Sequence, residues 1–319
     1  MLHRISRNHL SLSSRLSARA VFSIQAHQSR PRRHSSAMTS NIPNDAWDSH
    51  IHITDPINFP ISSTATYTPH TALLPSALTN AAHLNLPNLV FVQPSTYGTD
   101  NTCLLHALKT IGPSKARGVV VIDPAKTTHE TLYAWHDLGV RGLRLNLKSV
   151  GRKLSKDDLI RLIAEHAEPV RMMKTWALQL YIDLSDIEHI APLLPSLNIK
   201  VVFDHYGSPP TLDSTSLSQL PGWHSLLEML QSPFAYVKIS APYRLSKDPE
   251  FKDLEFVTKE LLRVRDGKGV VFASDWPHTR FEGVDVGPFV EMCGEWCGGD
   301  QGLRERLFRG NAKVLWDVE

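Results

Sequence analysis

Three histidines and one aspartate have the residue types and spacing expected of a hydrolytic centre. His50 and His52 stand two residues apart, so in an extended strand both side chains point to one face. His205 and Asp275 each follow an apolar run much later in the chain. A carboxylate can take a proton from water, and imidazoles can polarise a carbonyl group and stabilise the developing oxyanion. We therefore predict Asp275 as the general base, with His50, His52 and His205 as the polarising groups.

The same residue types also suit other roles. His50, His52 and Asp275 could hold one divalent ion, zinc or manganese, because three protein ligands plus water complete such a site. The alternatives without chemistry are histidines satisfied within the core, and an aspartate that caps the turn before Trp276 and Pro277. A further hypothesis is a protein that only binds a ligand or a partner and catalyses no reaction. The complete set of three histidines and one aspartate disfavours it.

Eight short runs rich in Val, Ile, Leu and Phe are the elements that must position these residues. Strands buried on both faces appear in a sequence as continuous apolar runs, not as strict alternation. The predicted strands are residues 47–51, 88–93, 118–122, 142–147, 178–183, 200–203, 236–240 and 270–274.

Helical patterns lie between these runs. Capping boxes are predicted at residues 127–130 and 185–188, and a weaker one at residues 155–158, where a hydroxyl and a later carboxylate would satisfy free N–H groups. Strand and helix alternating eight times predict an α/β fold, the (β/α)8 TIM barrel, as one domain over residues 45–319. A doubly wound open sheet is the alternative, but no glycine-rich phosphate loop follows an early strand.

Polar residues stand at nearly every predicted strand end. Active sites of such barrels form at the carboxyl ends of the strands, and buried polar groups are costly without partners. A cluster of this kind therefore indicates a site. Its members, in chain order, are Asp48, His50, His52, Gln93, Ser95, Tyr97, Arg144, Asn146, Tyr181, Asp183, Asp204, His205, Lys238, Ser240, Arg244, Ser274, Asp275 and His278.

These motifs resemble the amidohydrolase superfamily, specifically its amidohydrolase-2 branch. The resemblance spans nearly all of the chain after Trp47. It is carried by Asp48-Ser-His-Ile-His52, Gly139-Val-Arg-Gly-Leu-Arg144, Phe203-Asp-His-Tyr-Gly207 and Phe272-Ala-Ser-Asp-Trp-Pro277. Metal-binding members of the superfamily typically add Lys or Glu at the fourth strand and His at the fifth. This chain has Arg144 and Tyr181 there, which argues against a binuclear metal centre.

Within that branch the chain is similar to the 2-pyrone-4,6-dicarboxylate lactonases, which hydrolyse a cyclic ester without a metal. The resemblance implies a lactonase that needs no cofactor and binds a small anionic substrate. Arg144 and Arg244 can each grip a carboxylate bidentately, and Lys148 and Arg152 could add positive charge. The substrate-binding residues it implies are Arg144, Arg244, Tyr181, Tyr67, Ser95 and Tyr97.

Structural ion pairs for the two arginines, and surface-loop roles for Tyr67, Ser95 and Tyr97, are the alternatives. The alternative activity is a metal-dependent hydrolase or decarboxylase of the same branch, acting on a small aromatic acid.

The first 40 residues have a different composition from the rest. Residues 1–44 hold seven Arg and no Lys, Asp or Glu, and the segment is rich in Ser without a long apolar run. This pattern predicts a disordered mitochondrial targeting peptide over residues 1–40 and a matrix location, with the cytoplasm as the alternative. The remaining chain has 27 basic and 32 acidic residues. Its mildly acidic balance predicts no nucleic-acid partner, and no apolar stretch predicts a membrane span. A monomer and a homo-oligomer both remain open.

Overall fold

The computed structural model describes residues 42–210, 212 and 216–318. The described residues all belong to one compact unit. The predicted targeting segment, residues 1–40, lies outside the described residues. Among the helices of the described part, none is both long enough and apolar enough to cross a membrane.

Eight parallel strands form one sheet in which each strand pairs with the next along the chain. All eight predicted strands are confirmed. The bounds of the first and sixth agree with the prediction, and those of the others differ by one or two residues. The strands are β1 (Trp47–Ile51), β2 (Asn88–Val92), β3 (Ala116–Val120), β4 (Val140–Asn146), β5 (Ala177–Tyr181), β6 (Lys200–Phe203), β7 (Ala235–Ile239) and β8 (Val270–Phe272).

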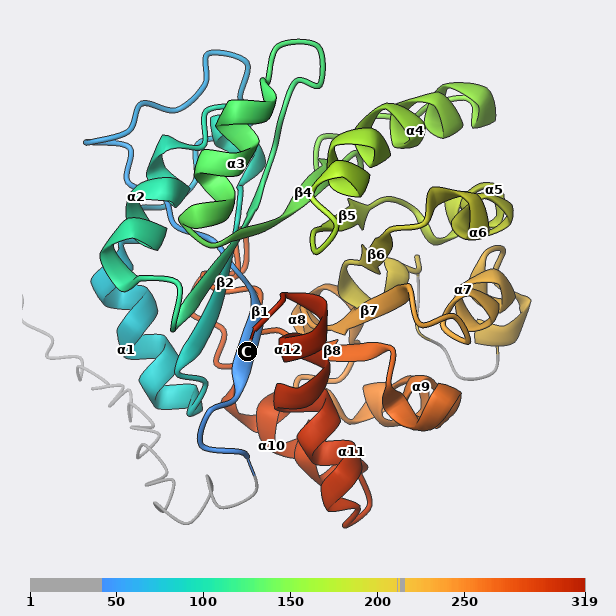
Figure 1. Ribbon diagram of the computed structural model, residues 1–319. Coiled ribbons are helices and arrows are strands. Elements are labelled where there is room, and N and C mark those ends of the chain that lie inside the picture. Colours follow the sequence, from blue (N-terminus) through green and yellow to red (C-terminus); the bar gives the residue numbers. More distant parts are fainter. Residues whose placement is uncertain (1–41, 211, 213–215, 319) are drawn as a thin grey trace, which may run out of the picture. The chain divides into compact units, whose positions relative to one another are not determined.

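The sheet curls so that β8 returns to β1, as expected for the predicted barrel (Figure 1). The junction lies just beyond the end of β8, where a parallel bridge joins Ile51 to Trp276. There the N–H of His52 donates to the carbonyl of Trp276 at 2.8 Å, and the N–H of Asp275 donates to the carbonyl of His50 at 3.0 Å. The backbone bonds that bring β1 and the β8 end together therefore also hold three predicted site residues in register.

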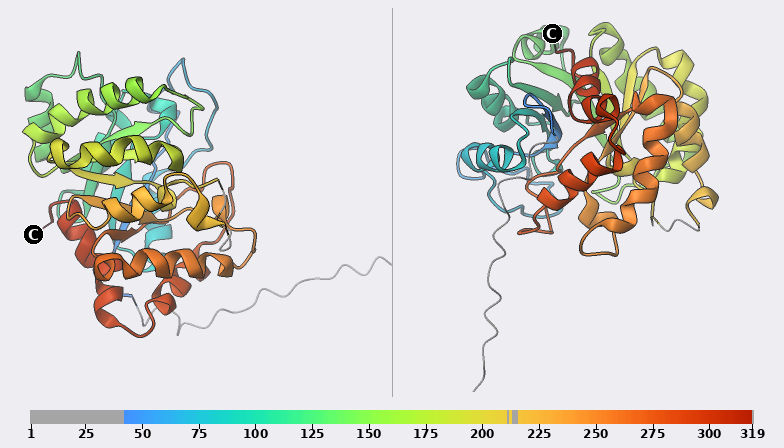
Figure 2. Two further views of the ribbon diagram at one scale, coloured as in Figure 1. Left: turned by 90° about the vertical axis from the view of Figure 1, so that its right-hand side faces the viewer. Right: turned by 90° about the horizontal axis from the view of Figure 1, so that it is seen from below.

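Helices lie around the outside of the strands (Figure 2). They are α1 (Leu74–Leu84), α2 (Thr102–Ile111), α3 (His129–Asp137), α4 (Lys156–Met172), α5 (Ile187–Ile190), α6 (Leu194–Leu197), α7 (Trp223–Met229), α8 (Pro242–Leu245), α9 (Glu255–Arg263), α10 (Gly287–Trp296), α11 (Gln301–Glu305) and α12 (Asn311–Leu315).

The capping predictions have mixed outcomes. Ser155 caps α4 as predicted, since its hydroxyl accepts from the N–H of Asp158 at 3.1 Å. The N-cap of α3 is Thr128, one residue later than predicted. The predicted box at residues 185–188 is wrong, because a short 3-10 turn occupies its start and Glu188 instead accepts from the N–H of Gly222 at 2.7 Å.

Two apolar layers place the polar residues at one end of the barrel. One layer packs the outer faces of the strands against the helices. The other includes alternate strand residues such as Val90 and Val92, together with Trp47 and the indole of Trp316, which donates to the hydroxyl of Ser49 at 3.1 Å. Because this second layer fills the interior at the amino ends of the strands, the interior polar groups gather at the carboxyl ends.

Candidate active site

Asp48 fixes the end of β1 against the segment that follows β8. Its Oδ1 accepts from the N–H of His50 at 3.1 Å and from the N–H of Ser274 at 2.9 Å. Burial raises the pKa of Asp48 to about 6 despite these bonds. The alternation along β1 directs His50 and His52 to one side, as the spacing predicts. Asp48 therefore holds the backbone that presents the two histidines and the following Asp275.

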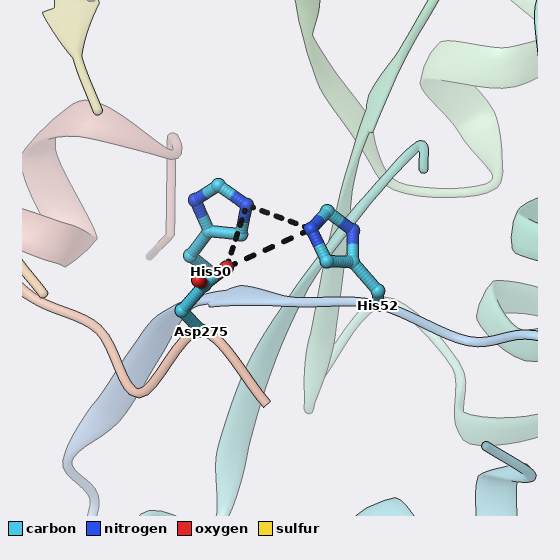
Figure 3. A group of neighbouring side chains, drawn as sticks. All are labelled: His50, His52 and Asp275. Carbon is cyan, nitrogen blue, oxygen red and sulfur yellow. Dashed lines mark hydrogen bonds and ion pairs between the residues drawn. The ribbon is translucent and has the colours of Figure 1, made fainter. Parts of the chain in front are cut away.

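Three of the four predicted catalytic side chains, His50, His52 and Asp275, lie together in Figure 3, and the fourth, His205, also approaches Asp275. Oδ1 of Asp275 lies 3.6 Å from Nε2 of His50 and 3.7 Å from Nε2 of His52. Oδ2 lies 3.8 Å from Nε2 of His205. Burial disfavours the charged carboxylate, but His205, His50 and Arg244 outweigh it and hold the pKa of Asp275 well below its usual range. Asp275 is therefore ionised at neutral pH, the state that a proton acceptor or a metal ligand requires.

One oxygen of Asp275 is held by neighbours from the segment after β7. The hydroxyl of Tyr243 donates to Oδ2 at 2.6 Å, and Nε of Arg244 donates to the same oxygen at 3.2 Å. Arg244 also donates to the carbonyl of Thr279 at 2.9 Å. With Oδ2 engaged in this way, Oδ1 is the oxygen left to face His50 and His52.

Burial keeps the histidines neutral. It lowers the pKa of His52 and of His205 to about 4, and lowers that of His50 well below its usual value. Nδ1 of His52 lies 2.7 Å from the carbonyl of Val92, which can only accept, so this nitrogen carries the proton and Nε2 carries the lone pair. Nδ1 of His205 shares a 2.8 Å hydrogen bond with the hydroxyl of Ser240.

A buried ionic group lies beneath the histidines. Asp204 accepts from Nη2 of Arg144 at 3.2 Å and from Nε2 of Gln179 at 3.0 Å, and its Oδ1 lies 3.3 Å from Nζ of Lys238. These cations outweigh the effect of burial and keep the pKa of Asp204 well below its usual range. Burial lowers the pKa of Lys238 to about 8, which still leaves it mainly protonated at neutral pH. Asp204 thus compensates two buried cations.

Nδ1 of His50 has two partners in this group, and they favour opposite tautomers. It lies 3.3 Å from Nζ of Lys238, a donor, and 3.3 Å from Oδ1 of Asp204, an acceptor. When Lys238 donates, the proton of His50 sits on Nε2 and can reach Nε2 of His52 at 3.2 Å. When Asp204 accepts, Nε2 of His50 carries a lone pair. In the first state His50 donates to His52, whereas the second state suits a metal ligand.

The spacing of these groups fits one metal ion. Nε2 of His50, Nε2 of His52 and Oδ1 of Asp275 lie 3.2 to 3.7 Å from one another. A tetrahedral ion with bonds of about 2.0–2.1 Å separates its ligand atoms by roughly 3.3 Å. A second group of three, formed by His50, Asp204 and His205, is less suitable, because the ammonium of Lys238 already lies against Asp204.

A cavity of about 190 Å³ opens at this end of the barrel, which restricts it to a small substrate. It contains one carboxylate, Asp275, and four cationic side chains. Its walls include most of the predicted substrate-binding residues. The lining residues are His52, Tyr67, Pro94, Ser95, Arg144, Asn146, Lys148, Ser149, Tyr181, His205, Arg244, Asp275, Thr279 and Arg280.

Three residues expected to contact the substrate are not among these lining residues: His50, which is fully buried, Tyr97 and Arg152. The ring of Tyr97 is buried, and its hydroxyl accepts a 2.8 Å hydrogen bond from the N–H of Asp55. Arg152 lies in solvent on the connection to α4. The structural ion pairs considered for Arg144 and Arg244 do form, with Asp204 and Asp275, and both arginines also line the cavity.

Three residues of the site had no predicted catalytic or substrate-binding role. Tyr243 precedes the predicted Arg244, but only its hydrogen bond to Asp275 identifies it. Lys238 had a visible signal, since it is a charged residue inside an otherwise apolar strand. Arg280 follows the Asp275 motif and reaches the cavity because the backbone turns sharply there.

The amidohydrolase family model Amidohydro_2 matches residues 47–318. A 2-pyrone-4,6-dicarboxylate hydrolase of Comamonas testosteroni is 27% identical over 252 residues, which cover 76% of this chain and 79% of the relative. A 4-sulfomuconolactone hydrolase of Hydrogenophaga intermedia is 24% identical over 255 residues, which cover 79% of this chain and 80% of the relative.

Two solved structures have the same fold. A Pseudomonas putida protein assigned as a 2-pyrone-4,6-dicarboxylic acid hydrolase is 31% identical, with a TM-score of 0.72 over 87% of this chain and 99% of that chain. An Acinetobacter baumannii protein with the same assignment was solved with citric acid bound. It is 23% identical, with a TM-score of 0.67 over 86% of this chain and 99% of that chain.

Proposed function

The chain belongs to the amidohydrolase family, and from that membership we propose that it is a hydrolase that opens small lactones carrying acidic groups, such as 2-pyrone-4,6-dicarboxylate. Two of its relatives are hydrolases of acidic lactones, though at low identity. The observation that carries the proposal is the pairing of an ionised Asp275, beside three neutral histidines, with a cavity of four cations. Such a cavity favours an anionic substrate over a neutral one.

The arginines of the cavity have donors left for substrate. Arg144 lines the cavity, and each of its two amino groups donates within the protein, to the carbonyl of Gln93 and to Asp204. Each amino group carries a second N–H, which is left to donate to a substrate carboxylate. Arg244 lies beside the general base, so a carboxylate bound there would hold the reacting carbonyl close to Asp275. We assign Tyr67, Ser95 and Tyr181 to the same binding surface because they line it.

The proposed reaction begins with a water molecule beside Oδ1 of Asp275. Its oxygen bonds to the lactone carbonyl carbon while Asp275 takes its proton. The charge that collects on the carbonyl oxygen is stabilised by His205, which lines the cavity and whose Nε2 carries a proton when its Nδ1 accepts from the hydroxyl of Ser240. The ring C–O bond then breaks, and the ring oxygen leaves as an enolate that receives the proton from Asp275. An enolate is a good leaving group, which lowers the demand for further activation.

The first test is a spectrophotometric assay with the purified protein. Ring opening removes the conjugated pyrone, so its ultraviolet absorbance should fall with time. We expect kcat/KM for 2-pyrone-4,6-dicarboxylate to exceed that for unsubstituted 2-pyrone by about 100-fold or more, because each charge-assisted hydrogen bond contributes about 1.5–3 kcal/mol. Equal kcat/KM values for the two lactones would contradict the proposal that the cavity prefers an anionic substrate.

Tyr243→Phe should slow the reaction without weakening substrate binding. The variant keeps the ring but loses the hydroxyl that fixes Oδ2, so Oδ1 of Asp275 is less well oriented toward water. We expect kcat to fall about tenfold and KM to change less than about twofold. Tyr206→Phe is the matched control, since it removes a buried hydroxyl that bonds Thr258 at 2.9 Å instead. A loss of activity that only tracks a loss of folded protein in both variants would contradict this role for Tyr243.

A metal-dependent hydrolase is the second candidate, favoured by the spacing of His50, His52 and Asp275. These residues would hold the ion, which would supply Lewis-acid polarisation and a more acidic water. His50 also has hydrogen-bond partners without an ion, because Lys238 can donate to its Nδ1 and its Nε2–H then faces Nε2 of His52. The two candidates therefore differ in what they require of His50.

Removal of metal distinguishes the candidates. We expect dialysis against a chelator to leave kcat/KM within about twofold, because the proposed oxyanion donors are side chains of the protein. Elemental analysis of the same samples serves as the control. Activity that disappears with the metal and returns with zinc or manganese would assign the histidines as ligands.

A further inference from the structure

The cavity holds four cationic side chains, and three of them already pair with a carboxylate of the protein. Lys148 lies 3.1 Å from Asp183, while the pairs of Arg144 with Asp204 and of Arg244 with Asp275 were described above. Arg280 differs from the other three. Within residues 42–210, 212 and 216–318, its guanidinium has neither an ion pair nor a hydrogen bond.

The guanidinium of Arg280 lies over the ring of Tyr67, with 4.5 Å between its central carbon and the ring centroid. The acid nearest to it in sequence, Glu282, accepts from the backbone N–H of Arg280 at 3.0 Å and lies 3.8 Å from His70. Stacking on an aromatic face orients a guanidinium while leaving the N–H groups at its edge free to donate. Arg280 thus presents oriented and unused donors at an exposed part of the cavity wall.

The loop that carries Arg280 is fixed to the catalytic aspartate. The N–H of His278 donates to the carbonyl of Asp275 at 2.9 Å, and the N–H of Phe281 donates to the carbonyl of His278 at 2.7 Å. Arg244, which binds Asp275, also holds the carbonyl of Thr279. Arg280 itself has a φ of 70°, a left-handed conformation that a non-glycine residue adopts only when its surroundings enforce it. These hydrogen bonds and the backbone conformation therefore fix the position of Arg280 relative to Asp275.

We propose that Arg280, stacked on Tyr67, forms a rim subsite that binds a second acidic group of the substrate. This inference rests on the proposed function, and it narrows the substrate class to diacids. One acidic group binds at the buried arginines, beside the reacting carbonyl. The other pairs with Arg280, the cation that lacks a carboxylate partner within the described residues. Arg280 thereby selects diacids over monoacids of the same ring size.

The experiment measures binding of two planar acids that the enzyme cannot hydrolyse. Isophthalate has two carboxylates in meta positions, as on 2-pyrone-4,6-dicarboxylate, and benzoate has one. Calorimetric titration of both acids is carried out on the wild type, Arg280→Gln, Arg280→Lys and Arg152→Gln. Arg152→Gln is the matched control, because it removes the same charge from an exposed position that does not line the cavity.

Wild type should bind isophthalate about tenfold more tightly than benzoate, which corresponds to one charge-assisted contact. Arg280→Gln should remove this preference and leave benzoate binding within about twofold, while Arg280→Lys keeps part of it. Arg152→Gln should match wild type for both acids.

Three results would overturn the rim subsite. The first is an equal loss of isophthalate binding in Arg280→Gln and Arg152→Gln. It would mean that the overall charge of the protein, and not a contact with Arg280, strengthens isophthalate binding. The second is an equal loss of benzoate and isophthalate binding in Arg280→Gln. The third is a wild type that binds isophthalate no better than benzoate. None of these measurements depends on turnover, so failure of the lactonase assay and failure of this inference are distinguishable.

Discussion

Asp275→Asn should reduce kcat for ring opening by about 10³- to 10⁴-fold, which is near the upper range for loss of a general base. Asparagine has nearly the same shape as aspartate, so the variant can still accept from Tyr243 and Arg244 and the cavity keeps its walls. It cannot take a proton from water. The initial rate of absorbance loss under saturating 2-pyrone-4,6-dicarboxylate measures the effect, and binding of isophthalate shows that the site remains assembled.

Asp123→Asn is the control for this substitution. Asp123 follows β3 but is paired in solvent with Lys126 and does not line the cavity. It should keep kcat within about twofold of wild type. Nearly normal turnover by Asp275→Asn would contradict the assignment of Asp275 as proton acceptor, whether or not a metal takes part.

Asp204→Asn should be the most destabilising of the substitutions considered, at about 3–5 kcal/mol of unfolding free energy. The change leaves Lys238 and Arg144 buried without their compensating charge. Guanidinium unfolding followed by circular dichroism measures the loss. Asp123→Asn breaks only an exposed pair, and it should cost less than about 1 kcal/mol.

A second substitution tests the reason for that loss. Lys238→Met removes one of the two buried cations that Asp204→Asn leaves without a compensating charge. The double variant should therefore have an unfolding free energy about 1 kcal/mol or more above that of Asp204→Asn alone. Losses that simply add would contradict the view that Asp204 acts by compensating Lys238. They would point instead to the hydrogen bond from Gln179 as its main contribution.

The barrel and the centre of the site were predictable from the sequence for physical reasons. Strands buried on both faces must be continuous apolar runs, so eight such runs identify eight strands even though their ends shift by a residue or two. The period of two in a strand places His50 and His52 together. Asp275 and His205 follow strand ends, and in a parallel barrel those ends meet.

The positions of Arg280 and Tyr97 depend on local backbone turns, which the sequence did not reveal. Asp275, His278 and Arg280 all have positive φ values, and this series of turns brings Arg280 back to the cavity. The predicted substrate-binding role of Tyr97 is wrong because a short helical turn directs its hydroxyl to the N–H of Asp55 and away from the cavity. No periodicity in a sequence encodes such turns. The targeting peptide over residues 1–40 and the matrix location remain predictions.

Mass spectrometry of the product formed in water labelled with heavy oxygen tests the hydrolase proposal most directly. Purified protein is incubated with 2-pyrone-4,6-dicarboxylate, and the product is compared with that from ordinary water. We expect a ring-opened product that has gained one molecule of water, with a single heavy oxygen in the carboxylate made from the lactone carbonyl. A product that has lost carbon dioxide, or a substrate that returns unchanged, would contradict lactone hydrolysis at Asp275.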